Sequence, residues 1–163
     1  MRRDNAPLVA VGAVVVRGDR VLFVRQIYPP FAGQWVVPAG LSEPGERVDE
    51  TVRRELLEET RIEAEVVGLI GLTSVVAPPP PYVSSHVFLI FLCRPTNEAE
   101  PVADGSENDA VGFFSLEDLA TMGEPVEPQS RLIAGRVLRG QYRILPPADM
   151  QSGTIFGEIA AWM

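Results

Sequence analysis

Several features that would assign a chain to an oxidising compartment or a membrane are missing from this sequence. Cys93 is the only cysteine among 163 residues, so no disulfide can form within the chain. A chain with so little cysteine fits a reducing compartment such as the cytoplasm. No apolar run is long enough to span a bilayer. The apolar stretch Leu8 to Val16 follows two arginines as in a secretion signal, but it is short, charged residues follow at once, and no small-residue cleavage site is evident.

Positive charge is also scarce. The chain has 14 basic and 22 acidic residues, a formal net charge of −8. Such a chain is a poor partner for nucleic acids and for anionic membranes, so we expect neither. His86 is the only histidine and lies beside an apolar stretch, where a histidine is usually structural. Without repeats or an evident linker, the length predicts a single domain over residues 1–163.

Strand and helix patterns alternate along the chain. Leu8 to Val16 and Val21 to Arg25 predict a β-hairpin around the turn Gly18-Asp19. Two long helices are predicted, one starting near Glu46 or Arg47 and one over Glu127 to Arg139, and they could cover opposite faces of a sheet. The other predicted strands are Gln34 to Pro38, Ala64 to Val76 as one or two strands, Ser84 to Cys93, and Ala110 to Phe114. This order indicates an α/β fold.

The first long helix carries three acidic residues with a short spacing. Glu55, Glu58 and Glu59 stand at i, i+3 and i+4, which places their side chains within an arc of roughly 100°. Three carboxylates held so close repel one another, and a hard divalent cation such as Mg²⁺ would neutralise them and recruit phosphate ligands. The alternative is a solvated helix in which Arg53 and Arg54 pair with the glutamates.

The loop before this helix decides between the two interpretations. From Gly40 to Ile62 the chain reads GLSEPGERVDETVRRELLEETRI, with five residues between Gly40 and Glu46 and seven between Glu46 and Arg54. This pattern resembles the Nudix box, G-x5-E-x7-R-E-U-x-E-E-x-G-U, where U is a bulky apolar residue. Every defined position matches except one, since Arg61 stands where the family has glycine.

The resemblance implies a fold, an activity and a set of roles. The fold is an α/β/α sandwich with a mixed β-sheet, and the activity is hydrolysis of a nucleoside diphosphate linked to another group, with Mg²⁺ or Mn²⁺. By position in the motif, the implied metal ligands are Glu58, Glu59, the carbonyl of Gly40 and Glu55, which could instead be the base that activates water. Glu46 and Arg54 would form the ion pair that fixes the loop against the helix.

Candidate residues also lie outside the motif. Glu107 precedes an aromatic strand, as a catalytic glutamate does in this family, and is the best candidate for a further ligand or base, with Asp109 as its rival. Arg25 ends the second strand and would either bind a substrate phosphate or simply be solvated. Trp35 is better explained by core packing than by stacking on a base.

The substrate and the assembly are less constrained. The phrase Pro38-Ala39-Gly40-Leu41 looks like that of ADP-ribose pyrophosphatases, so ADP-ribose or another ADP-sugar is the leading expectation, ahead of nucleoside triphosphates. A catalytically silent nucleotide-binding module is the other alternative. The prolines Pro78 to Pro81 predict a stiff loop or a wall of the substrate site. The apolar end, Ile155 to Met163, would pack on the domain or on a partner subunit, which leaves a homodimer open.

Overall fold

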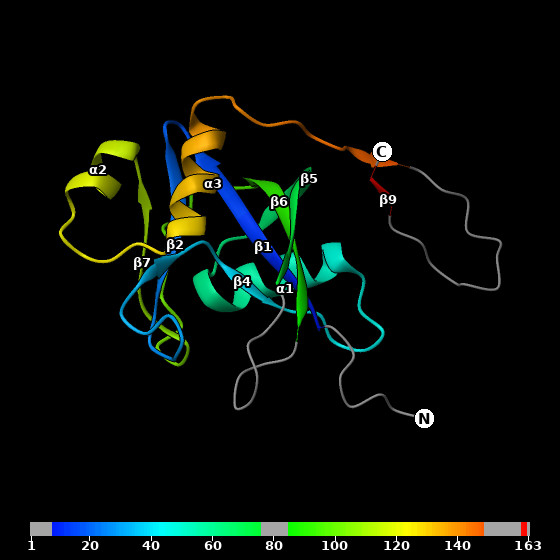
Figure 1. Ribbon diagram of the computed structural model, residues 1–163, viewed down its shortest axis with the longest axis horizontal. Coiled ribbons are helices and arrows are strands. Elements are labelled where there is room, and N and C mark those ends of the chain that lie inside the picture. Colours follow the sequence, from blue (N-terminus) through cyan, green and yellow to red (C-terminus); the bar gives the residue numbers. More distant parts are fainter. Residues whose placement is uncertain (1–7, 76–84, 149–160, 163) are drawn as a thin grey trace.

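The computed structural model describes residues 8–75, 85–148 and 161–162 (Figure 1). The prolines Pro78 to Pro81 and most of the apolar tail lie outside the described residues. The strands are β1 (Leu8–Arg17), β2 (Arg20–Gln26), β3 (Trp35–Val36), β4 (Ala39–Leu41), β5 (Ala64–Val75), β6 (His86–Pro95), β7 (Asn108–Phe114), β8 (Pro147–Ala148) and β9 (Ala161–Trp162). The helices are α1 (Val48–Thr60), α2 (Leu116–Thr121) and α3 (Pro128–Leu138). None of the helices in the described part of the chain is long and apolar enough to cross a membrane.

The main sheet is mixed. Its strands follow the order β3-β2-β1-β6-β5, while β4 pairs with β1 and β7 pairs with β2. The predicted hairpin is present, since β1 and β2 run antiparallel, whereas β1 and β6 run parallel from Leu8 opposite His86 to Val15 opposite Cys93. β5 is one strand with two register shifts, which resolves the expectation of one or two strands.

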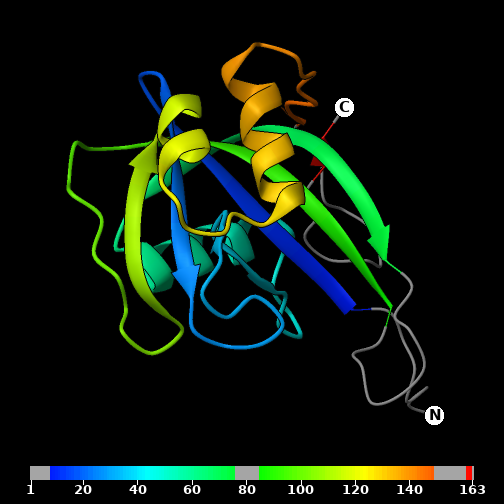
Figure 2. The same ribbon diagram turned by 60° about the vertical axis from the view of Figure 1, so that its left-hand side comes forward.

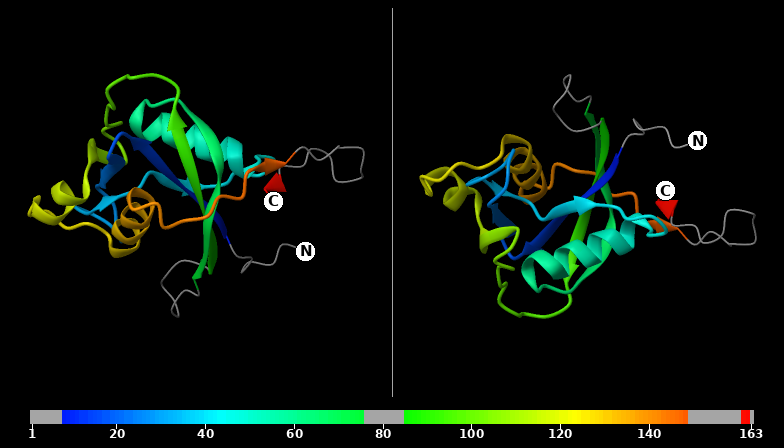
Figure 3. Two further views of the ribbon diagram at one scale, coloured as in Figure 1. Left: turned by 90° about the horizontal axis from the view of Figure 1, so that it is seen from above. Right: turned by 90° about the horizontal axis from the view of Figure 1, so that it is seen from below.

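The two long helices cover opposite faces of this sheet. Alternate residues of β1 point to different sides, so Val14 packs with Ala134 and Val137 of α3, while Val11 packs with Val52 and Leu56 of α1. Figures 2 and 3 show α3 on one side of β1 and β6 and α1 on the other. The expected α/β/α sandwich with a mixed sheet is therefore confirmed.

The ends of α1 agree closely with the sequence pattern. The helix begins at Val48, one residue after the expected start, with Arg47 as its N-cap. At its other end, Arg61 is the C-cap and adopts a left-handed conformation with φ 61° and ψ 13°. Arg61 is the only non-glycine residue with positive φ in the described ranges. The chain thus keeps the turn that glycine favours and builds it with arginine.

Trp35 and Cys93 are both buried in the core. Trp35 is 6% exposed and packs edge-on against Phe114, 4.8 Å between ring centroids. Cys93 is 2% exposed, and burial raises the pKa of its thiol to about 12. Core packing for Trp35 is therefore confirmed, and the Cys93 thiol is buried as well.

Candidate active site

The C-terminal half of α1 presents three carboxylates in very different surroundings. Glu59 is 1% exposed, the Glu55 side chain is 13% exposed, and the Glu58 side chain is 58% exposed. The helix turns them progressively from the core to solvent, because Val52 and Leu56 on the adjacent stripe are buried against the sheet. The three carboxylates therefore differ in burial, with Glu59 in the interior, Glu55 mostly buried and Glu58 at the surface.

Glu59 is the most buried of the three carboxylates. Its Oε2 accepts a hydrogen bond from the Ala39 amide at 3.0 Å, and its Oε1 accepts one from the Gln26 side chain at 3.1 Å. Burial, with the nearby charges of Glu55 and Glu107, raises the pKa of the Glu59 carboxyl to about 8, although the two donors oppose the shift. A buried carboxylate among other carboxylates favours a positive charge beside it.

Glu55 lies directly against Gly40 of β4. A Cβ at position 40 would come within 2.0 Å of the Glu55 carboxyl carbon, so any other residue there would push that side chain away. This close approach is a physical reason for glycine at the start of the motif. Burial also raises the pKa of Glu55, an effect that Arg54 opposes.

Arg54 connects the loop to the helix. Its Nε and Nη2 bind the two carboxylate oxygens of Glu46 at 2.8 and 3.0 Å, and its Nη2 also donates to the Leu41 carbonyl at 3.1 Å. Its Nη1 binds Glu55 at 2.7 Å and Glu58 at 3.1 Å. The loop carrying Gly40 is thereby held at a fixed distance from the helix carboxylates.

The donor set suits a hard divalent cation. Carboxylate and carbonyl oxygens are the ligands that Mg²⁺ and Mn²⁺ prefer, and here they come from Glu55, Glu58, Glu59 and the backbone at Gly40. Within the described ranges, no three acidic, His or Cys side chains already converge as a metal site would require. Glu55 and Glu58 are turned toward Arg54 instead.

A cavity of about 440 Å³ opens beside Gly40. Its volume is within the usual range for small-molecule sites. Glu107, the candidate outside the motif, lines this cavity and lies close enough for its charge to raise the pKa values of Glu55 and Glu59. The other lining residues come from several strands, from the loop after β2 and from the start of α3, and they include Phe31, His86, Glu127 and Gln129.

Asn108 is a residue that sequence reasoning missed. It is fully buried, and its Nδ2 donates to the main-chain carbonyl of Glu59 at 3.0 Å. Its Oδ1 is buried and has no partner among the described residues. Asn108 thus fixes the end of α1 to the strand that follows Glu107. No local pattern reveals this contact, because the two residues are 49 positions apart.

Arg25 and Asp109 bind each other and do not line the cavity. The Arg25 Nε and Nη2 meet the Asp109 carboxylate at 2.7 and 3.1 Å, and Nη1 meets Glu124 at 3.0 Å. Glu124 also accepts a hydrogen bond from the Trp35 indole. Neither Arg25 nor Asp109 is among the residues that line the cavity, so a substrate contact by Arg25 stays a prediction.

Comparison with known proteins identifies the family. The NUDIX domain model matches residues 6–134, which is most of the chain. The chain belongs to the Nudix hydrolase family. Nudix hydrolases generally use divalent metal ions, in agreement with the oxygen donors around Gly40.

Individual relatives carry two kinds of name. An ADP-ribose pyrophosphatase from Methanocaldococcus jannaschii is 32% identical over 114 residues, covering 69% of this chain and 64% of that protein. An 8-oxo-dGDP phosphatase from Mus musculus is 28% identical over 121 residues, covering 73% of this chain and 35% of that protein. This chain therefore spans less than two thirds of the length of either relative.

The fold has close structural counterparts within the Nudix family. The crystal structure of a MutT Nudix hydrolase from Burkholderia pseudomallei superimposes with a TM-score of 0.68 at 28% identity. The match covers 81% of this chain and 98% of that one. The likeness thus extends well beyond the motif, over both faces of the sheet.

Proposed function

We propose that this chain hydrolyses a pyrophosphate bond in a nucleoside diphosphate-linked small molecule, with ADP-ribose or another ADP-sugar as the leading substrate. The observation that carries the proposal is that Gly40 lines a cavity of a size suited to small molecules, with Glu107 on its wall, and that Glu55 lies directly against Gly40 on the helix that also carries Glu58 and Glu59. We also propose that residues 1–163 form one domain and that the protein works in a reducing compartment.

The metal, Mg²⁺ or Mn²⁺, would be held by the carboxylates of Glu55, Glu58 and Glu59 and by the Gly40 carbonyl. When bound, it supplies charge that offsets the phosphate oxygens and lowers the pKa of a bound water. Arg54 holds Glu55 and Glu58 in reach of each other, and the Ala39 amide and Gln26 orient Glu59. Little covalent chemistry is required of the protein, which positions charges around the reacting phosphate.

Two residues are candidates for the general base that takes the proton from the attacking water. Glu55 is close to Gly40 and has a raised pKa, which is a useful property for a base at neutral pH. Glu107 is exposed on the cavity wall and is free of the Arg54 network. Comparing the pH dependence of kcat in Glu55→Gln and Glu107→Gln at saturating metal separates them, because loss of the base removes the acid limb of the pH–rate profile.

The relatives support the substrate class at two levels. One is named an ADP-ribose pyrophosphatase, which agrees with the phrase Pro38-Ala39-Gly40-Leu41. Another is named an 8-oxo-dGDP phosphatase, which keeps oxidised nucleotides, including triphosphates, as the second candidate. The cavity is lined by Phe31 and Phe88 as well as polar groups, so a flat base fits its chemistry.

The deciding experiment is a substrate panel with Mg²⁺ or Mn²⁺, reading released monophosphate or phosphate. ADP-ribose, other ADP-sugars, 8-oxo-dGDP and nucleoside triphosphates are compared at equal concentration. Turnover of triphosphates alone would overturn the ADP-sugar assignment. Tight nucleotide binding without turnover of any compound would instead identify a silent binding module.

Substitution of the proposed metal ligands tests the metal assignment separately. Glu58→Gln keeps the shape of an exposed side chain and removes a charged oxygen, so we expect turnover to fall by about 100-fold or more, given that even residues that merely support metal ligands cost 10- to 100-fold. Glu65→Gln is the matched control, because Glu65 is equally exposed and pairs with Arg94 away from the site. Near-normal turnover of both Glu58→Gln and Glu59→Gln at saturating Mg²⁺ would refute the assignment.

A further inference from the structure

A second hollow lies on the α3 side of the sheet. It is a groove of about 600 Å³ between β5, β6, α3 and the segment that follows α3. The groove and the cavity beside Gly40 have only Gln129 and Ile133 in common among their lining residues. The groove is therefore a separate hollow, and no step of the proposed hydrolysis uses it.

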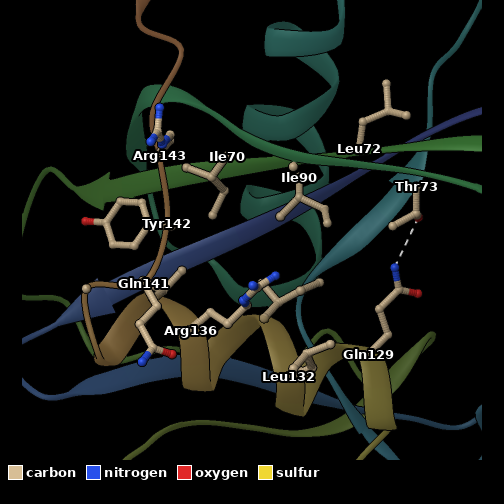
Figure 4. A pocket seen from close by; sticks show the side chains of 14 residues that line it. Ile70, Leu72, Thr73, Ile90, Gln129, Leu132, Arg136, Gln141, Tyr142 and Arg143 are labelled. Atoms are coloured by element: carbon tan, nitrogen blue, oxygen red, sulfur yellow. Dashed lines mark hydrogen bonds between the residues drawn. The ribbon is translucent and has the colours of Figure 1, made fainter.

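The floor of the groove is apolar and one end is closed. Ile70 and Ile90 project from β5 and β6 into it (Figure 4), and Ile133 of α3 also lines it. At one end, Gln129 Nε2 donates to Thr73 Oγ1 at 3.1 Å and joins α3 to β5 (Figure 4). Leu72 and Leu132 on the rim are 60% and 61% exposed. These apolar surfaces are left open to solvent, at a cost that a ligand would remove.

Two arginines line the groove. Arg136 extends from α3 across the groove, and Arg143 stands beside Tyr142 at the end opposite the Gln129–Thr73 bond (Figure 4). The segment from 128 to 148 contains four arginines and no acidic residue, in a chain whose net charge is −8. Two of these four arginines, Arg136 and Arg143, line the groove.

The arginines of the groove differ from most others in this protein. Seven arginines form ion pairs with carboxylates, namely Arg17, Arg20, Arg25, Arg47, Arg53, Arg54 and Arg94. Arg136 and Arg143 make no ion pair with any residue in the described part of the chain. In a protein with an excess of acidic residues, two arginines left beside an apolar floor match a ligand that brings its own negative charge.

We propose that this groove binds an organic anion with an apolar or aromatic body and a single carboxylate, sulfonate or phosphate group. The body would lie on Ile70, Ile90 and Ile133, and the anionic group would meet Arg136 and Arg143. The volume suits a molecule of one or two rings or a short acyl chain. A purely apolar ligand would leave both guanidinium groups unused, and a simple inorganic anion would leave the floor exposed.

The test uses the full chain and a fluorescent probe of this class, 1-anilinonaphthalene-8-sulfonate. We expect saturable binding of one probe per chain, weakened at least tenfold in the double variant Arg136→Gln, Arg143→Gln. Arg139→Gln is the matched control, because Arg139 is the C-cap of the same helix, has no described ion pair and lines a different hollow. This variant should bind the probe within twofold of the wild type. Octanoate should displace the probe at concentrations where octanol does not.

Several outcomes would overturn the proposal. If Arg139→Gln weakens probe binding as much as the double variant does, the probe is attracted by general positive charge. If the double variant binds the probe as tightly as the wild type, the two arginines are not part of the site. Loss of binding in Phe31→Ala would place the probe in the cavity beside Gly40. Light scattering that finds a dimer in the wild type and a monomer in the double variant would assign the groove to contact between copies. Nucleotide turnover in the double variant should equal that of the wild type, so this test does not depend on the proposed function.

Discussion

Replacing Arg61 by glycine should stabilise the protein. Arg61 holds φ at 61° and ψ at 13°, a left-handed conformation that costs a residue with a Cβ about 1–2 kcal/mol. Its side chain is exposed and makes no hydrogen bond or ion pair with a described residue, so its removal forfeits little. The amide at this position donates to the Leu57 carbonyl at 3.0 Å, and glycine keeps that bond.

The gain is reduced by the unfolded state. Glycine has more backbone freedom when unfolded, which costs about 0.4–1 kcal/mol relative to a residue with a Cβ. The net expectation for Arg61→Gly is a rise of about 0.5–1 kcal/mol in the free energy of unfolding. For a chain of this size, that corresponds to about 1–4 °C in Tm.

Urea denaturation followed by circular dichroism, with calorimetry for Tm, measures the effect. Arg61→Ala removes the long side chain but keeps the Cβ, so it should unfold like the wild type, and Arg61→Val should be less stable because a β-branched residue tolerates positive φ poorly. Turnover of Arg61→Gly should stay within tenfold of the wild type, since the register of α1 through Glu59 is unchanged. A glycine variant less stable than the alanine variant would refute the reasoning, and an inert wild type beside an active glycine variant would support the silent-module alternative.

Two further predictions concern residues around the motif. The pKa of Glu46 is lowered from 4.5 to about 2, mainly by its hydrogen bonds to Arg54, so the stabilisation by this carboxylate is complete above pH 4.5 and is lost as pH falls through 2. Because the Glu46 side chain is only 16% exposed, we expect Glu46→Gln to lower the free energy of unfolding by about 1–2 kcal/mol at pH 7. In urea titrations the variant should show a flatter stability profile between pH 5 and 2, and an unchanged profile would contradict the ion-pair role. Asn108→Asp would place a carboxylate against the Glu59 carbonyl in a buried position, at a cost of about 2–3 kcal/mol; an unaltered urea midpoint would show that the Asn108 contact is dispensable.

The sequence predicted the parts of this fold that depend on local pattern. The hairpin, the start of α1, the helix that Gly140 ends and the burial of Trp35 each follow from turn chemistry, periodicity or composition within a few residues. The motif spacing also brought Gly40 next to Glu55, a contact that only the folded chain makes. Here the resemblance to the Nudix box indicated that Gly40 and Glu55 belong to one site, which periodicity alone does not indicate.

What the sequence did not predict depends on contacts between distant segments. The three carboxylates of α1 look equivalent in the sequence, yet Glu59 is buried and Glu58 is exposed, because the sheet covers only one side of the helix. Asn108 reads as one more polar loop residue, and its role appears only when β7 is placed beside the end of α1. The groove at Arg136 is likewise formed by elements that are distant in the sequence, namely two strands within residues 64–95 and a helix over residues 128–138.

The parallel pairing of β1 with β6 has a consequence for folding. Leu8 pairs opposite His86, so the first strand of the protein meets this neighbour only after 78 further positions along the chain. Closing so long a loop is slow compared with forming the β1–β2 hairpin, and topologies rich in such pairings fold slowly. During synthesis, α1 leaves the ribosome before β6 has been synthesised. Its apolar stripe and its carboxylates are therefore present before the sheet that covers them is complete. The rate at which β6 docks on β1 should therefore set the time at which the whole motif becomes ordered.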